Sequence, residues 1–192
     1  SMVPVISRRA LLRRLISTSA LGVASAGGAF GYGNLLERHW IHVIRRDIFL
    51  PNLPEEMDGF RIAQLSDLHL EPWTTAEDIA DAVKVTNELA PDLIVITGDF
   101  VTNSVKPAGR LAEVLAGLRA PHGVLGCMGN HDVWNQPATL SRFMAERQIE
   151  ILRNQGLRLH TPKGTLFIAG LDSAWAGKPD VSPALRNWKP SE

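Results

Sequence analysis

The chain has 192 residues, 45% of them hydrophobic and 21% charged, and its 20 Lys and Arg residues balance its 20 Asp and Glu residues. This composition is typical of a globular protein and excludes a wholly disordered chain. A net charge of zero gives no overall electrostatic attraction to nucleic acid, and the single cysteine, Cys127, excludes an intrachain disulfide and a thiolate zinc cluster. Any catalytic chemistry must therefore use Asp, Glu, His and Asn side chains.

The N-terminal segment has the pattern of an export signal. Four arginines stand at positions 8, 9, 13 and 14 without an acidic residue among them, and the stretch from Leu15 to Tyr32 carries no charge. A basic segment before a moderately apolar one is typical of a signal peptide, and the pair Arg8-Arg9 after Ser7 resembles a twin-arginine signal. We therefore predict a twin-arginine-type signal or anchor with a linker over residues 1–46, followed by a folded domain over residues 47–192.

Such a signal predicts passage through the twin-arginine export machinery and a location that is periplasmic, at the extracytoplasmic face, or membrane-anchored. The segment from Ala24 to Ala26 offers a cleavage site, whereas residues 15–33 are long enough for a membrane anchor, since roughly 20 apolar residues span a bilayer. Cleavage and retention both stay open. The alternative is an amphipathic N-terminal helix on the surface of the domain.

Strands and helices are expected to alternate through the rest of the chain. Residues 47–53 read as an edge strand, because Pro51 lacks a backbone donor. Thr74 and Thr75 precede a helical pattern from residue 76 as N-caps. The further elements expected are strands at 60–65, 93–96 and 123–128, helices at 111–118 and 135–149, and a hairpin joining 157–159 to 165–169. The β-branched run at 93–96 has no polar face, which indicates a central strand in a mostly parallel sheet of an α/β domain.

Polar residues follow three successive strands of this predicted sheet. They are, in chain order, Asp67 and His69, then Asp99 after Gly98, then Asn130, His131 and Asp132. Because ligands bind at the carboxyl ends of strands in such sheets, we expect these side chains to lie at one edge. Oxygen and imidazole ligands without a thiolate suit Mn, Fe or Zn.

The motifs D-x-H, G-D and G-N-H-D occur here in order, each after an apolar strand, and they resemble those of the calcineurin-like metallophosphoesterase family. The stretch from Gln64 to His69, with the twin-arginine start, is most similar to the exported or membrane-associated bacterial branch. The resemblance covers residues 47 to 192 and implies an α/β/β/α two-sheet sandwich. It also implies hydrolysis of a phosphoester, as a phosphodiesterase or phosphatase. The expected substrate is a phosphorylated small molecule or lipid, including a lipid-linked phosphate or pyrophosphate.

The resemblance implies a dinuclear centre of divalent or trivalent ions, Mn, Fe or Zn. In that pattern Asp67 and His69 would bind the first ion, and Asp99 would bridge both. Asn130 would bind the second ion through its side-chain oxygen. The physical logic agrees, since two cations about 3.5–4 Å apart activate a water and neutralise phosphate oxygens during in-line attack.

The same resemblance implies catalytic roles for two neighbouring residues. His131 would act on the leaving group as an acid, or stabilise its charge, without binding metal. Asp132 would orient His131, since an acid beside an imidazole sets its tautomer.

This chain departs from the family pattern downstream, where the family supplies three further histidines. After His131 the sequence contains only His160, in the predicted hairpin. We therefore expect a truncated domain with an incomplete second sheet. The alternative to an active hydrolase is a catalytically dead fragment that lacks the C-terminal histidine ligands. A nuclease with the same metal chemistry is disfavoured by the neutral charge, so no nucleic-acid partner is expected.

Overall fold

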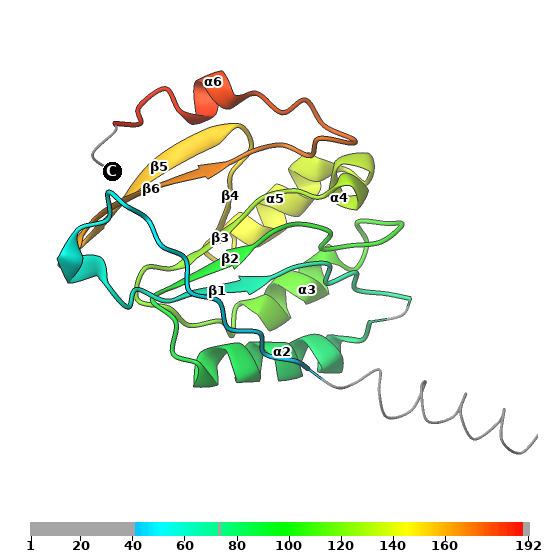
Figure 1. Cartoon of the computed structure of the whole chain (residues 1–192). Helices are drawn as coiled ribbons and strands as arrows, with labels where there is room; N and C mark the ends of the chain where they lie inside the picture. The colour runs from blue at the N-terminus through cyan, green and yellow to red at the C-terminus, as the bar shows by residue number, and fades with distance from the viewer. Residues whose placement is uncertain (1–40, 73, 190–192) are drawn as a thin grey trace, which may run out of the picture. The chain divides into compact units, whose positions relative to one another are not determined.

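The computed structural model describes residues 41–72 and 74–189 (Figure 1). The chain divides into two units, residues 1–46 and 47–192. The predicted signal lies outside the described residues except for 41–46, so the signal and its anchor stay predictions. Within the described part of the chain, no helix is both long and apolar enough to cross a membrane.

A four-stranded parallel sheet is the centre of the second unit. Its strands lie in the order β1 (Ile62–Leu65), β2 (Leu93–Ile96), β3 (Val124–Gly126) and β4 (Ile149–Ile151). All three pairings are parallel, so the strands share one carboxyl edge. The two central strands, β2 and β3, are almost entirely buried, which confirms the expectation for the apolar run at 93–96.

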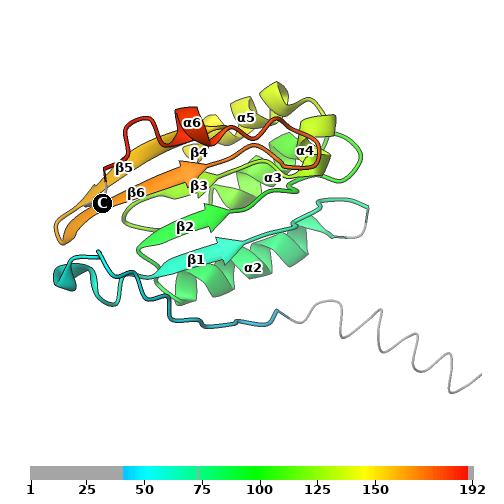
Figure 2. The same ribbon diagram turned by 45° about the horizontal axis from the view of Figure 1, so that its top comes forward.

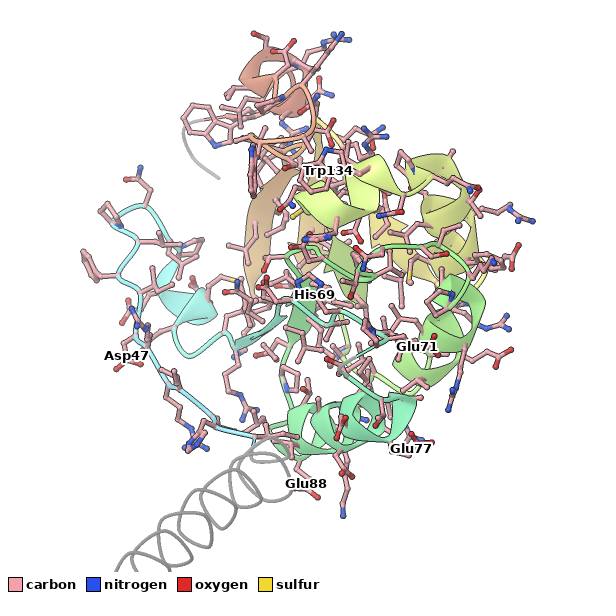
Figure 3. The ribbon with its side chains drawn as sticks, turned by 90° about the vertical axis from the view of Figure 1, so that its right-hand side faces the viewer. Asp47, His69, Glu71, Glu77, Glu88 and Trp134 are labelled. Atoms are coloured by element: carbon pink, nitrogen blue, oxygen red, sulfur yellow. The ribbon has the colours of Figure 1, made fainter. Side chains whose placement is uncertain are left out.

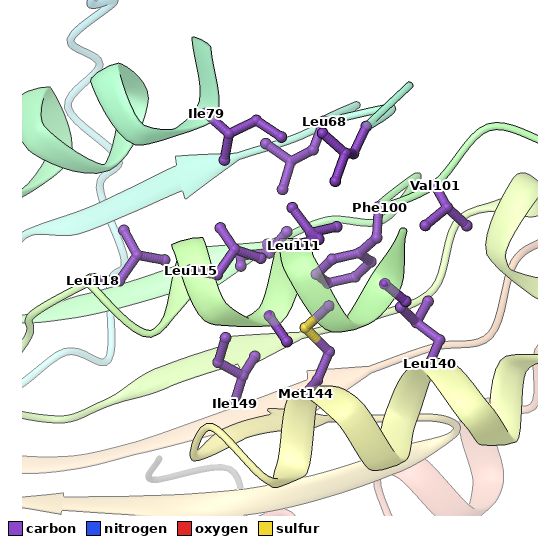
Figure 4. Close-up of a cluster of buried hydrophobic side chains, with 14 of the residues drawn as sticks. Leu68, Ile79, Phe100, Val101, Leu111, Leu115, Leu118, Leu140, Met144 and Ile149 are labelled. Atoms are coloured by element: carbon purple, nitrogen blue, oxygen red, sulfur yellow. The ribbon is translucent and has the colours of Figure 1, made fainter. Parts of the chain in front are cut away.

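Helices cover one face of this sheet (Figure 1, Figure 2). They are α2 (Ala76–Glu88), α3 (Ala108–Leu115) and α5 (Pro137–Ala145). The predicted capping box starts α2, because Thr75 Oγ1 accepts a hydrogen bond from Asp78 N and the Asp78 carboxylate accepts one from Thr75 N. Leu111, Leu140 and other apolar side chains of the helices pack against the sheet in the main core (Figure 4).

The opposite face of the sheet carries a hairpin. Strands β5 (Gln155–Thr161) and β6 (Gly164–Gly170) pair antiparallel, as the sequence predicts. Alternation along β2 explains both layers, since Ile94 and Ile96 join the helix-side core while Leu93 packs with Leu157 and Ile168 of the hairpin. A short helix, α6 (Val181–Ala184), contacts β5. The layered two-sheet α/β architecture confirms the predicted fold class.

Two local predictions differ from the structure. The expected edge strand at 47–53 forms no strand, and Phe49 in it is 89% exposed. A 3-10 helix, η2 (Glu55–Met57), follows it. The expected helix at 135–149 is shorter, because the chain turns at Gln148 with φ of 60° and enters β4. A further helix, α4 (Asn130–Trp134), precedes it. The helix was predicted too long because its apolar residues at helical spacing are followed closely by the apolar residues of β4. Periodicity alone does not separate such a helix from the short strand after it.

Candidate metal centre

The three predicted clusters meet at the carboxyl edge of the parallel sheet. Asp67 N donates to Gly98 O at 3.1 Å and His69 N donates to Asp99 O at 2.9 Å, so the segments after β1 and β2 run side by side. Asp67, His69 and Asp99 have φ of 54°, 44° and 53°. Left-handed backbone is uncommon for residues other than glycine, and such conformations gather at functional sites. The left-handed backbone of these three residues is therefore typical of a functional site.

The side chains of these residues converge. His69 Nε2 lies 3.7 Å from Asp67 Oδ1 and 3.5 Å from Asp99 Oδ2. One ligand atom each from His69, Asp99 and His131 lies within 4.8 Å of the others. Metal–ligand bonds of about 2.0–2.2 Å place two ligands of one ion no more than about 4.4 Å apart, so the shorter separations fit a shared ion. The nitrogen and carboxylate donors suit a borderline or hard divalent cation.

Asp99 lies at the middle of this arrangement. Its Oδ1 accepts a hydrogen bond from His131 N at 3.1 Å, while its Oδ2 faces His69. The two oxygens of Asp99 thus have different partners, the His131 backbone nitrogen and the His69 ring. Asn130 is half-buried and begins α4 directly before His131.

Two glycines permit this close approach. A Cβ atom on Gly98, whose φ is 99°, would overlap the backbone of Gly129. A Cβ on Gly129 would overlap both the carboxylate and the backbone nitrogen of Asp99. The glycines of the G-D and G-N-H-D motifs are therefore required by contact between the loops after β2 and β3.

The His131 ring is oriented by a backbone carbonyl. Its Nδ1 lies 2.7 Å from Thr102 O, and since a carbonyl only accepts, Nδ1 carries the hydrogen and Nε2 is the atom available to the site. Thr102 Oγ1 also donates to His69 O at 3.3 Å. Sequence reasoning missed Thr102, and no signal pointed to it, because the orienting atom is a main-chain oxygen.

The prediction that Asp132 orients the His131 ring is wrong, because the Asp132 carboxylate makes its hydrogen bonds to backbone nitrogens and not to that ring. The fully buried Asp132 carboxylate accepts hydrogen bonds from the backbone of Phe100, Val101 and Gly129 at 2.9–3.2 Å. Successive residues on a helix point in different directions, so neighbours on α4 diverge. Asp132 instead ties the loop after β2 to the start of α4. Its burial raises the pKa of the carboxyl to about 6, against the lowering effect of these hydrogen bonds.

His160 and Asp172 lie in different environments from these residues, and Asp67 is the most exposed of the predicted ligands. His160 is exposed on β5, where its Nδ1 is 3.1 Å from Thr165 Oγ1. Asp172 is buried after β6 and pairs with Arg153. The side chain of Asp67 is 66% accessible, and Ser66 Oγ donates to its carboxylate at 2.6 Å. The site is therefore open on the Asp67 side.

Comparisons with known proteins agree with this geometry. Residues 60–179 match the calcineurin-like phosphoesterase family. The uncharacterized metallophosphoesterase YkuE of Bacillus subtilis is 35% identical over 183 residues, 93% of this chain and 64% of the relative. Phosphodiesterase YaeI of Escherichia coli is 28% identical over 176 residues, 90% of this chain and 64% of the relative. The UDP-2,3-diacylglucosamine pyrophosphatase LpxG of Chlamydia trachomatis is 38% identical over 102 residues, 53% of this chain and 31% of the relative. The chain thus spans less than two thirds of these relatives.

Proposed function

Because the chain belongs to the calcineurin-like phosphoesterase family, we propose that the edge described above is the metal centre of a phosphoester hydrolase. The observation that carries the proposal is the convergence of ligand atoms from His69, Asp99 and His131 within 4.8 Å. The reaction adds water across a P–O ester bond, leaving a phosphate and an alcohol. With cations held between its carboxylate and imidazole ligands, this open edge would attract a polar, anionic substrate group.

Two ions fit the donor set in this proposal. Asp67 and His69 would hold the first, Asp99 would be shared with the second, and Asn130 would contribute its side-chain oxygen to the second. When bound, the ions supply an activated water and neutralise charge on the phosphate. Mn, Fe and Zn all suit these ligands.

His131 acts at the leaving group in this scheme. Thr102 O accepts from Nδ1, so in the doubly protonated ring Nε2 carries the second proton, which it delivers to the departing oxygen or uses to stabilise its charge. The ring also lies within ligand distance of the centre, which makes direct metal binding by Nε2 the second role open to it. Asp132 acts through the backbone and positions α4.

The substrate class proposed is a lipid-linked phosphate or pyrophosphate. It is supported by the named activity of the chlamydial LpxG relatives, which act on UDP-2,3-diacylglucosamine, and YaeI is named as a phosphodiesterase. From the N-terminal sequence pattern we also propose export through the twin-arginine machinery and a periplasmic or membrane-anchored location. Residues 15–33 are proposed to make the membrane contact.

A second candidate is a chain that binds metal weakly and does not turn over. It is favoured by the position of His160, whose ring contacts Thr165 on the hairpin. In this case the three motifs still hold an ion, but its coordination is incomplete.

One experiment separates these outcomes. The purified 192-residue chain is loaded with Mn²⁺, its bound metal is measured by mass spectrometry, and hydrolysis of bis(p-nitrophenyl) phosphate is followed. Asp99→Asn removes the bridging carboxylate at unchanged volume, and Asp81→Asn on the exposed side of α2 is the matched control. We expect Asp99→Asn alone to lose metal and activity. Bound metal without turnover supports the second candidate, and metal content that Asp99→Asn leaves unchanged contradicts both.

A further inference from the structure

Two exposed tryptophans continue outward from the metal centre. The Trp134 ring meets the His131 imidazole with centroids 5.5 Å apart at 69°, and the Trp175 ring meets Trp134 at 5.6 Å and 70°. His131 in turn meets His69 edge-on at 4.9 Å. Four rings therefore form an unbroken series from a predicted ligand to the surface, and Figure 3 shows Trp134 on the same side of the domain as His69.

The exposure of this pair is unusual for its residue type. Trp134 is 55% exposed and Trp175 is 79% exposed. Tryptophan is normally well buried, because its indole has one of the largest apolar surfaces of any side chain. Apolar surface left open beside a cluster of convergent polar groups is characteristic of a ligand-binding surface. We call Trp134 and Trp175 the aromatic wall.

The loop that carries Trp175 is held at both ends. At its start, the buried Asp172 accepts two hydrogen bonds from Arg153, from Nε at 3.2 Å and from Nη2 at 2.8 Å. Asn154 Oδ1 accepts from the backbone nitrogens of Asp172 and Asp180, both at 3.0 Å, and so joins the start of the loop to its end. A bidentate ion pair and the hydrogen bonds of the Asn154 side chain therefore hold the two ends of the loop that carries Trp175.

The shape of the wall selects the chemistry of its occupant. The Trp134 and Trp175 rings lie at 70° to each other and form an open corner. A planar ring of a ligand can contact the two indoles in this corner with its face or with its edge. An acyl chain gains most from an enclosing channel, and the exposure of both indoles shows that the corner is open. A group bonded to a phosphate at the centre passes Trp134 first, because Trp134 contacts His131 directly.

We infer that Trp134 and Trp175 are specificity-determining residues that bind a planar aromatic group carried by the phosphoester substrate. This inference rests on the proposed phosphoester hydrolysis and names the substrate feature that the site selects. In this inference, an aryl group joined to phosphorus through the ester oxygen meets Trp134. A nucleobase, separated from phosphorus by its ribose, reaches Trp175.

The test measures binding and does not depend on turnover. The Mn²⁺-loaded chain is titrated calorimetrically with phenylphosphonate and with methylphosphonate, whose C–P bonds are not ester bonds. We expect phenylphosphonate to bind about three- to tenfold tighter, as for other aromatic pairs. Trp134→Ala should remove this preference, while Trp134→Phe should keep most of it. Phe49→Ala, at an aromatic residue that is 89% exposed on the segment before η2, should change nothing.

A second pair of probes distinguishes the sources of the ring. Adenosine 5′-methylenephosphonate is compared with the corresponding ribose phosphonate, and Trp175→Ala should remove the preference for the adenosine compound. A preference for phenyl alone assigns an aryl ester, and a preference for adenosine alone assigns a nucleoside.

Each failure has its own meaning. If methylphosphonate does not bind the Mn²⁺-loaded chain, the proposed function fails and the inference with it. If every phosphonate binds alike, or if the tryptophan variants keep the preferences, the wall does not select substrate although the metal centre stands. If Trp175→Ala instead converts a dimer into a monomer in sedimentation velocity at unchanged phosphonate affinities, the wall is a contact between copies, which also overturns the inference.

Discussion

The ion pair between Arg153 and Asp172 gives the sharpest prediction for stability. The Asp172 side chain is 7% exposed and that of Arg153 is 37% exposed, and two hydrogen bonds join them. Arg153→Met keeps much of the side-chain length but leaves a buried carboxylate without its cation. Hydrogen bonds to charged groups contribute about 1.5–3 kcal/mol each, and the partial exposure of Arg153 reduces their sum, so we expect a loss of about 2–3 kcal/mol at pH 7.

The pH dependence of this loss follows from the pKa of Asp172. Hydrogen bonds from Arg153 hold that pKa below its ordinary value, so the carboxylate stabilises the folded chain above the unfolded pKa of about 3.9. The contribution is lost as the pH falls through the lowered folded pKa. In Arg153→Met the acid protonates more readily, so the difference from the wild type should shrink on acidification.

Urea unfolding followed by circular dichroism at pH 7 and near pH 3 measures both effects. The single variant Asp172→Asn and the double variant Arg153→Met with Asp172→Asn complete a double-mutant cycle. The double variant removes the carboxylate charge that Arg153→Met alone leaves without a partner. A stability loss that is the same at both pH values, or single changes that simply add in the double variant, would refute the reasoning. A folded single variant that has also lost the phenylphosphonate preference would show that the pair positions the aromatic wall.

Three further predictions concern the site and the core. Gly129→Ala should abolish metal binding, because its Cβ would overlap the Asp99 carboxylate, whereas Gly109→Ala on α3, where the nearest atom is a Phe143 ring carbon at 3.4 Å, should keep its bound Mn²⁺ when the metal is measured by mass spectrometry. Leu111→Ala should cost about 2–5 kcal/mol in urea unfolding, since this fully buried residue leaves a cavity under the sheet, and a loss below about 1 kcal/mol would contradict the packing. Thr75→Ala should cost about 1 kcal/mol by removing one half of the capping box, and an unchanged unfolding midpoint would count against that role.

The location of the candidate metal centre was predictable because it depends on local pattern and one rule of topology. The apolar run at 93–96 indicates a central parallel strand, and the structure buries it between helices and hairpin. Parallel strands in one sheet end at one edge, so residues directly after them must be neighbours. Asp67, His69 and Asp99 accordingly lie together.

Predictions failed where an element depends on a partner distant in sequence. The segment at 47–53 has strand composition but forms no ladder within the described residues, because a strand exists only through its pairing. The short strand β4 depends on β3, which lies more than twenty residues earlier, and its apolar residues continue the pattern of the preceding helix.

The sequence by itself determined the family, the α/β architecture and the order in which oxygen and imidazole donors reach the sheet edge, since each follows from strand patterns and the motifs after them. Only the tertiary structure decided how these groups are supported. Thr102 orients His131 through a main-chain oxygen that no side-chain motif records, and Asp132 turns away to bind the backbone. Trp175 meets Trp134 from a loop that begins at Asp172, which pairs with Arg153. Such contacts join residues distant in the chain, and their geometry arises only once the layers have packed.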